Sequence, residues 1–252
     1  MMKKRYHNYG KSILEILLLM LVTCTFMAAC HVQGSVPPRI LVVTGGHAYD
    51  TAAFENFFLQ SPEVKTDMIM HPQANQALAS GKFKDYDAVV FYDMWQDINA
   101  EQKKAFLELT QKGTGLVFLH HALVSYQKWD DFEEIIGGRY LQKNYVSNPS
   151  KASGYQHGLD LEVSVVHPDH PITKNMKDFQ IHDEGYSNLK ILSTVKPLLT
   201  TNHPDCADTV AWANRYNHSK IVYILFGHDH HGFLDEDFKQ LLFNSIRWVS
   251  GD

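Results

Sequence analysis

Cysteine is scarce in this sequence of 252 residues, which contains only Cys24, Cys30 and Cys206. The first two lie in an N-terminal segment that we expect to be processed during export, so the folded part retains Cys206 alone. One cysteine forms neither an intramolecular disulfide nor a cysteine-rich metal site. Any bound metal must therefore be held by His, Asp and Glu side chains, and His is abundant with 15 residues.

Positive charge is also in short supply. Lys and Arg number 23 against 28 Asp and Glu, which gives a formal net charge of −5. Residues 1–29 hold four of the basic residues and one of the acidic ones, so their removal changes the charge to −8. An acidic chain without a basic run argues against nucleic-acid binding. After the N-terminal segment, no further apolar run is long enough to span a bilayer.

The dinucleotide-binding pattern G-x-G-x-x-G is absent as well. Gly45-Gly46 follows an apolar run, but two glycines alone do not make that fingerprint. We therefore expect no nucleotide cofactor. His47 comes directly after the pair, where the turn of the backbone approaches the ligand crevice of an α/β sheet. His47 is accordingly a candidate substrate-binding residue.

The N-terminus has the features of an export signal. Four basic residues lie within the first eleven positions, an apolar stretch runs over 13–29, and Phe26-Met-Ala-Ala-Cys30 resembles a bacterial lipobox. We expect residues 1–29 to be a lipoprotein-type signal peptide, Cys30 to carry the lipid, and 30–38 to be a tether. Two alternatives are an ordinary signal peptide and an uncleaved anchor. A lipidated Cys30 would make this an exported, membrane-anchored lipoprotein that faces the periplasm.

The remainder, residues 39–252, has the pattern of a single α/β domain. Its first half alternates predicted strands with predicted helices, which favours a three-layer, mostly parallel sheet with helices on both faces. The second half is less regular but contains further strands and an amphipathic closing helix. The expected strands are 39–44, 64–70, 87–92, 115–119, 159–166, 196–200, 209–213 and 220–226, and the expected helices are 51–60, 100–112, 129–136 and 235–249.

Two apolar strands end directly in histidine. Residues 115–119 lead into His120 and His121, and residues 220–226 lead through Gly227 into His228. Ligands of open α/β sheets bind beyond the carboxyl ends of the strands. These histidines could therefore converge on one site although they lie about a hundred residues apart.

Three further groups of polar residues extend this pattern. Asp183-Glu184 is flanked by His182 and Tyr186, and in an extended chain only one of the two carboxylates enters a given pocket; the alternative is a solvated acidic turn. His228 and His230 have the H-x-H spacing of a zinc chelate, or belong to a polar loop. His170, in a His-Pro turn, either binds substrate or caps the turn.

These segments together resemble the ThuA-like (trehalose-utilisation) family, whose fold is like that of the class I glutamine amidotransferases, a flavodoxin-like architecture. The matching pieces are 39–47, 113–122, Gly137-Gly-Arg-Tyr140, 170–173, 179–186, Gly227-His228 and 243–248. The resemblance implies no catalytic Cys at the turn after the fourth strand, which agrees with His120 there. It also implies a role in sugar metabolism, on oxidised (3-keto) glucosides such as those derived from trehalose.

One departure from the family is visible. The family often has a His soon after the Gly-Gly-Arg-Tyr motif, whereas here 141–153 intervene and His157 is the nearest candidate. The residues carried over from the resemblance are His120, Asp183, Glu184, Tyr186 and His228.

The sequence thus predicts a carbohydrate-processing lipoprotein with a His/carboxylate pocket. We expect catalytic roles for His120, Asp183, Glu184 and His228, substrate-binding roles for His47, His121, Tyr186 and His170, and a divalent metal such as zinc on His120, His228 and Glu184. One alternative is a non-catalytic sugar-binding lipoprotein that serves a partner enzyme or transporter, with stacking platforms among Trp95, Tyr126, Trp129 and Tyr140. Another is a hydrolase that uses Ser125.

Overall fold

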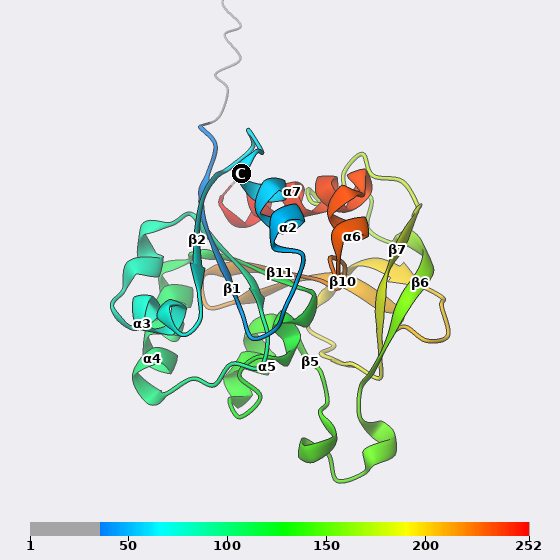
Figure 1. The fold of residues 1–252 in the computed structure, drawn as a ribbon, viewed down its shortest axis with the longest axis horizontal. Coiled ribbons are helices and arrows are strands. Elements are labelled where there is room, and N and C mark those ends of the chain that lie inside the picture. The colour runs from blue at the N-terminus through cyan, green and yellow to red at the C-terminus, as the bar shows by residue number, and fades with distance from the viewer. Residues whose placement is uncertain (1–35, 252) are drawn as a thin grey trace, which may run out of the picture. The chain divides into compact units, whose positions relative to one another are not determined.

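The computed structural model describes residues 36–251. The expected signal peptide and Cys30 lie outside this range. From residue 37 onward, the described residues cluster as one compact unit. Its centre is a nine-stranded sheet in the order β2-β1-β3-β4-β11-β10-β9-β6-β7 (Figure 1). No helix in the described range is long and apolar enough to cross a membrane.

One half of the sheet is parallel. Its strands are β2 (Lys65–Met70), β1 (Arg39–Gly45), β3 (Ala88–Asp93), β4 (Gly115–Leu119) and β11 (Ser219–Ile224). Every residue of β3 and β4 is buried, as expected for strands covered on both faces. Because these strands run in one direction, their carboxyl ends meet at one edge of the sheet, where the predicted histidines follow.

The other half is antiparallel, which corrects the expectation of a mostly parallel sheet. It contains β10 (Thr209–Tyr216), β9 (Lys196–Thr201), β6 (Gly154–Val165) and β7 (Phe179–Ser187). Four of the eight neighbouring strand pairs are therefore antiparallel. The connections explain this: Asn217-His218 alone joins β10 to β11, and a parallel crossover needs a dozen residues or more. Asn217 adopts a positive φ, which suits such a tight hairpin.

Helices cover both faces, which together with the sheet confirms an α/β fold. Figure 1 shows α2, α6 and α7 on one side of the sheet and α3, α4 and α5 on the other. The six are α2 (Thr51–Leu59), α3 (Gln73–Ala79), α4 (Ala100–Lys112), α5 (Asp130–Ile136), α6 (His230–Leu234) and α7 (Glu236–Val249). Asn99 caps α4 with a reciprocal Gln102 contact. Helix α3 was not predicted, since its short sequence QANQALA has little apolar periodicity.

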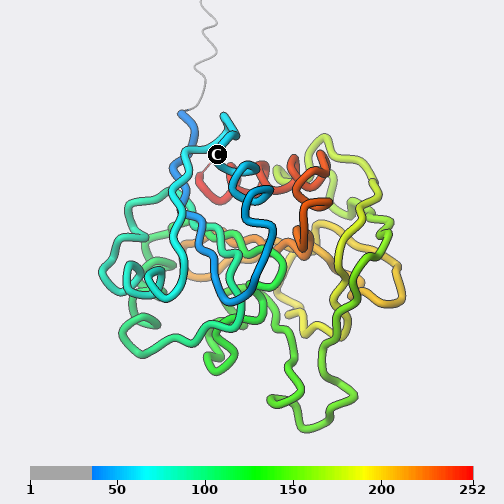
Figure 2. Tube along the Cα trace, in the orientation of Figure 1, coloured from blue at the N-terminus to red at the C-terminus, as the bar shows by residue number. Residues whose placement is uncertain are grey.

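Short elements complete the chain. They are the paired strands β5 (Gly138–Arg139) and β8 (Lys190–Ile191), and the 3₁₀ helices η1 (Lys82–Asp85), η2 (His120–Val124), η3 (Lys143–Tyr145) and η4 (Pro149–Lys151). The segment between β5 and β6 extends away from the sheet, as the green part of the trace shows (Figure 2). Its two 3₁₀ helices bury no residue, so the segment adds little to the core.

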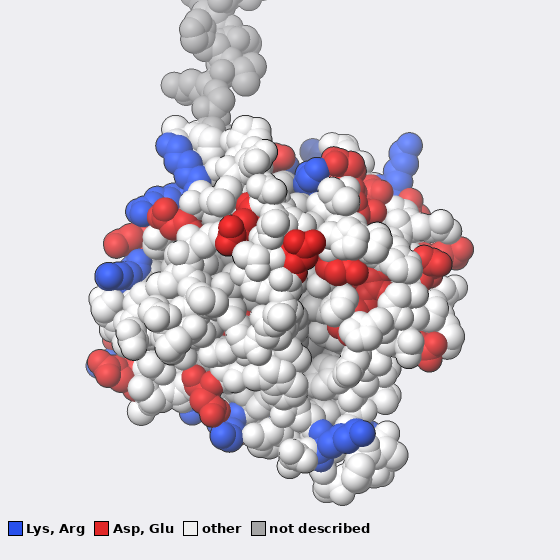
Figure 3. All heavy atoms as spheres, in the orientation of Figure 1, with Lys and Arg blue, Asp and Glu red and all other residues white. Residues whose placement is uncertain are grey.

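The surface agrees with the acidic composition. On the face drawn in Figure 3, Lys and Arg side chains lie toward the periphery, and several Asp and Glu side chains lie nearer the middle. Such a distribution does not attract polyanions to this face.

Candidate functional site

A pocket of about 430 Å³ lies at the carboxyl end of the parallel strands. It is lined by segments that follow β1, β3, β4 and β11, and by residues of β6 and β7. The lining residues are His47, Ala48, Met94, Trp95, His120, His121, Val124, Tyr140, Tyr155, His157, Glu184, Tyr186 and His228. Five histidines therefore converge here, as the strand-end pattern predicted for His47, His120, His121 and His228.

His120 forms the buried floor of the pocket. It follows β4 at a sharp turn, has a φ of 50° and is fully buried. Its Nδ1 lies 2.5 Å from the Leu225 carbonyl oxygen, so Nδ1–H donates there. Tyr223 also donates to the His120 carbonyl, at 2.9 Å. The backbone thereby fixes the ring and leaves Nε2 directed at the other polar groups of the site.

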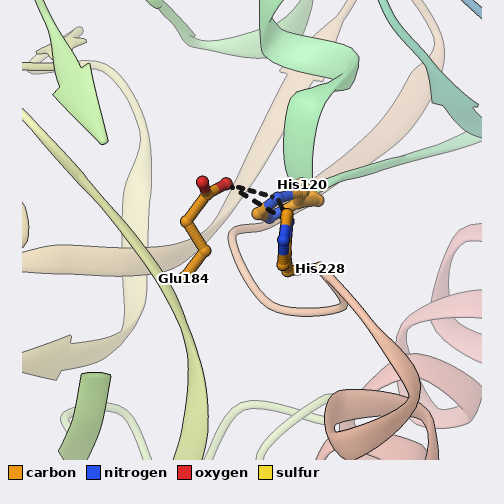
Figure 4. Close-up of side chains that lie close together, drawn as sticks. All are labelled: His120, Glu184 and His228. Atoms are coloured by element: carbon orange, nitrogen blue, oxygen red, sulfur yellow. Dashed lines mark hydrogen bonds and ion pairs between the residues drawn. The ribbon is translucent and has the colours of Figure 1, made fainter. Parts of the chain in front are cut away.

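Glu184 and His228 meet His120 at that nitrogen. Glu184 Oε2 lies 2.9 Å and His228 Nδ1 lies 3.2 Å from His120 Nε2, and the two partners are 3.4 Å apart (Figure 4). The Tyr186 hydroxyl is 3.0 Å from the same nitrogen. Glu184, His120 and His228 come from β7, the start of η2 and the loop after β11, so the fold alone brings them together.

The charges of the site depend on one another. Burial lowers the pKa of His120, but the hydrogen bond and charge of Glu184 outweigh this and raise it above its ordinary value. Burial likewise raises the pKa of Glu184, and the contact with His120 brings it below its ordinary value. Burial and the charge of His120 lower the pKa of His228. The pair His120–Glu184 therefore favours one shared proton and His228 favours its neutral form.

Asp183 lies on the opposite side of β7 and does not line the pocket. Its carboxylate accepts backbone N–H groups of Gly227 at 2.8 Å, His228 at 3.1 Å and Glu184 at 2.7 Å. Burial raises its pKa. Since only one of two adjacent carboxylates enters the pocket, Glu184 is the candidate for chemistry and Asp183 positions the loop that carries His228.

His47 and His121 form a second pair beside the floor. Their ring centroids are 3.7 Å apart, and each Nδ1 contacts a backbone carbonyl, that of Ala48 for His47 and that of Asp93 for His121. Burial lowers the pKa of both rings, most strongly for His121. Both are neutral rings whose Nε2 is a hydrogen-bond acceptor.

Most of the chain matches one known family. Residues 39–249 match the ThuA family, described as trehalose utilisation. The chain belongs to this family. No curated protein matches it.

Solved structures agree with membership of the ThuA family. A ThuA-like protein from Parabacteroides merdae has a TM-score of 0.71 at 18% identity, with 85% of this chain and 90% of that chain covered. A second from Bacteroides uniformis has a TM-score of 0.63 at 20% identity, with 84% and 90% covered. A GMP synthase-like protein from Thermoplasma acidophilum has a TM-score of 0.50 at 13% identity, with 83% and 92% covered. At these identities the likenesses show the fold alone.

Three candidates do not join the site of this ThuA-family protein. His170 packs against Trp248, with ring centroids 5.1 Å apart, and lines a separate cavity of about 670 Å³. His230 begins α6, so the chain is not extended over the H-x-H segment and this spacing makes no chelate. Ser125 is fully buried and donates to Asp93, which leaves it no access to a substrate. The structure therefore does not support a hydrolase based on Ser125.

His157 does reach the site, although it was not among the predicted site residues. Its Nδ1 lies 3.0 Å from Glu184 Oε1. A break in register between Gln156 and Leu159 bulges β6 here, and Gly158 has a positive φ. A glycine inside a strand signals such a bulge, and bulges re-aim side chains beside active sites. That signal was available in the sequence at Gly158.

The aromatic candidates divide into two groups. Tyr126 and Trp129 belong to the core, where Trp129 and Phe132 stack. Trp95 and Tyr140 line the pocket, together with Tyr155, which no sequence pattern singles out. Only the second group can contact a ligand.

His170 gives a testable dependence of stability on pH. Burial, with the nearby positive charges of Lys196, His167 and Arg215, lowers its pKa to about 4. The folded protein therefore keeps this ring neutral at a pH where the unfolded chain binds a proton, and acid favours unfolding between about pH 6.5 and about pH 4. We expect His170→Asn, whose side-chain oxygen can still accept from Ile172, to lose less stability than the wild type on acidification.

Urea unfolding at about pH 7.5 and about pH 5 measures this difference. His218→Asn, at an exposed position in the β10–β11 turn, is the matched control and should behave as the wild type. An equal loss in the wild type and His170→Asn would contradict the assignment.

Proposed function

We propose that this protein processes a carbohydrate, a glucoside or 3-keto-glycoside, in the pocket that contains His120, Glu184 and His228. The observation that carries the proposal is the convergence of these three side chains, from separate segments, on one cavity at the carboxyl edge of the sheet. Membership of the trehalose-utilisation family supports a sugar as the ligand. The absence of Cys from the turn at His120 argues against glutamine amidotransferase chemistry.

A divalent metal fits the same three residues. They offer two imidazole nitrogens and one carboxylate oxygen within 4.8 Å of one another. Catalytic zinc sites use three such ligands and leave a fourth position for water or substrate. The Leu225 carbonyl holds His120 with Nε2 directed at Glu184 and His228, as the outer partners of zinc-bound histidines orient the ligating nitrogen. The donor set also suits iron and manganese, so zinc is the example and not the only candidate.

When bound, the metal would polarise a sugar carbonyl or lower the pKa of a water molecule. The chain's own groups would do the rest. The neutral ring of His47 would accept a hydrogen bond from a sugar hydroxyl, and Tyr186 would donate one at the floor of the pocket. Nε2 of His121 is buried without a partner, so His121 would shape the wall of the pocket and not bind a hydroxyl through that atom. Without a metal, Glu184 would serve as the general base and His120 and His228 as polarising groups. Asp183 would act only by positioning His228, because its carboxylate already accepts three backbone N–H groups.

A non-catalytic sugar-binding protein is the second candidate. The observation that favours it is the exposure of Trp95 and Tyr155 at the pocket, since exposed aromatic rings can bind a sugar face without any reaction. The protein would then deliver its ligand to a partner enzyme or transporter. After export and removal of the signal peptide, the lipid on Cys30 would hold it at the membrane in either case.

The metal proposal predicts the behaviour of single variants. We expect purified protein to bind one zinc ion, and His120→Ala, Glu184→Ala and His228→Ala each to weaken binding by more than about 100-fold, because loss of an outer partner alone costs about 10–100-fold. Titration calorimetry with zinc measures the affinity, and elemental analysis gives the stoichiometry. His218→Ala removes an exposed histidine at the opposite end of β11 and should bind zinc as the wild type does. A wild-type protein that binds no divalent metal would remove the metal from the proposal.

The two candidate functions differ in turnover. If the protein is an enzyme, we expect it to convert a 3-keto-glycoside or glucoside, and Glu184→Gln to slow the conversion by at least about 100-fold, the usual effect of losing a general base or ligand. Mass spectrometry of the products, with and without zinc, follows the reaction. Glu162→Gln changes an exposed carboxylate of β6 and is the matched control. Tight binding without any product, unchanged in Glu184→Gln, would favour the sugar-binding protein.

The lipoprotein proposal is tested in the full-length chain. We expect Cys30→Ala to move the protein from the detergent phase to the aqueous phase in phase partitioning, because the acyl chains supply the stable anchoring. Cys24→Ala, inside the expected signal peptide, should leave the partitioning unchanged. An anchored Cys30→Ala variant would instead indicate that the N-terminal segment remains uncleaved.

A further inference from the structure

Exposed aromatic side chains gather at the site. Only three aromatic residues are among the exposed large apolar side chains of residues 36–251, namely Trp95 at 55%, Tyr145 at 50% and Tyr155 at 62%. Two of these three, Trp95 and Tyr155, line the pocket that contains His120 and Glu184. Because aromatic rings are costly to leave in water, their concentration at one cavity indicates a binding surface.

The backbone around Trp95 is built to present this side chain. Trp95 has a φ of 59°, in the left-handed region that bulky residues avoid. Neighbouring segments hold it there: Met94 N donates to Gly45 O at 2.8 Å, and Tyr126 N donates to Gln96 O at 2.8 Å. A Cβ on Gly46 would lie 1.7 Å from the Met94 carbonyl oxygen, so the two loops fit together only with glycine. A strained residue held open to solvent does not contribute to the core.

Tyr155 reaches the pocket from the other half of the sheet. It lies on β6, two residues before the bulge at His157, and its ring centroid is 5.2 Å from that of His157. Trp95 follows β3 in the parallel half. The pocket therefore changes along its depth, from a floor where His120 and Glu184 are 0% and 4% exposed to a mouth where two aromatic rings are more than half exposed. A ligand that contacts both levels must be longer than the group bound at the floor.

We propose that Trp95 and Tyr155 form a second sugar subsite at the mouth, so that the ligand is a glycoside of at least two rings. One ring lies at the His120–Glu184–His228 floor and the second stacks its C–H face on the aromatic side chains. This inference rests on the proposed function in taking a sugar as the ligand. It needs neither metal nor turnover, because stacking is a matter of binding alone.

Binding of matched one-ring and two-ring ligands tests the subsite. Trp95 is the only exposed tryptophan among the four of the chain, so its fluorescence reports occupation of the mouth. We expect trehalose and phenyl glucoside to perturb this fluorescence and to bind about tenfold tighter than methyl glucoside. Trp95→Ala and Tyr155→Ala, followed by calorimetry, should each remove most of that preference and leave the methyl glucoside affinity within about twofold.

Two further variants make the result specific. Trp95→Phe keeps an aromatic platform and should retain the preference, whereas Tyr145→Ala removes an exposed aromatic outside the pocket and should change neither affinity. The subsite is overturned if the Trp95→Ala and Tyr155→Ala variants weaken all ligands equally, if neither changes any affinity, or if no two-ring glycoside binds. If the protein neither binds zinc nor shows turnover but still prefers two-ring ligands, the proposed chemistry is wrong and the subsite stands. If zinc binding and turnover are found without a preference for two-ring ligands, only the subsite is wrong.

Discussion

One buried carboxylate joins the two halves of the sheet at the site. Asp183 belongs to β7, at the antiparallel edge, and it accepts backbone N–H groups of Gly227 and His228, which follow the parallel strand β11. These bonds are charge-assisted and shielded from water, so they are costly to break. The same residue directs its neighbour Glu184 to the other face of β7. The meeting of Glu184 with His120 and His228 therefore depends on a group that never touches the pocket.

The imidazole rings are ordered by the backbone rather than by one another. Carbonyl oxygens of Leu225, Asp93 and Ala48 each accept from Nδ1 of a different histidine, and this fixes the tautomer of His120, His121 and His47. Nε2 of His120 then faces the carboxylate of Glu184. Without a cation, His120 and Glu184 must share a proton, whereas a divalent ion held by His120, Glu184 and His228 would satisfy the lone pairs of these three groups together. Pre-set tautomers of this kind are expected of a site built to receive a ligand.

The parallel half of the sheet and its histidines could be predicted from the sequence. The opposite wall of the pocket, which β6 and β7 form, could not. Strands such as 115–119 are continuous apolar runs, and the rule that parallel strands end at one edge places His120 and His228 together without further information. The positions of His157 and Tyr155 depend on the pairing of β6 with β7 and on a bulge at Gly158. Gly158 is a sequence signal for the bulge, but the pairing of two strands separated by a long loop leaves none, so sequence patterns could not place these residues in the pocket. The two-residue turn Asn217-His218, which makes β10 and β11 antiparallel, likewise has no strong hairpin signal in the sequence.

The site has one wall from each half of the sheet, and the two walls differ in how well they tolerate substitution. The floor residues His120, His121 and His228 follow strands of the parallel half, which are buried on both faces and close-packed, so their geometry tolerates little change. Tyr155 and His157 come from the exposed part of β6, where substitutions disturb no core contact. Glu184 and Tyr186, on the buried part of β7, are the groups of that wall that contact His120 directly. Substitutions at the mouth can therefore change which second ring of the ligand is bound, while the groups that act at the floor stay the same.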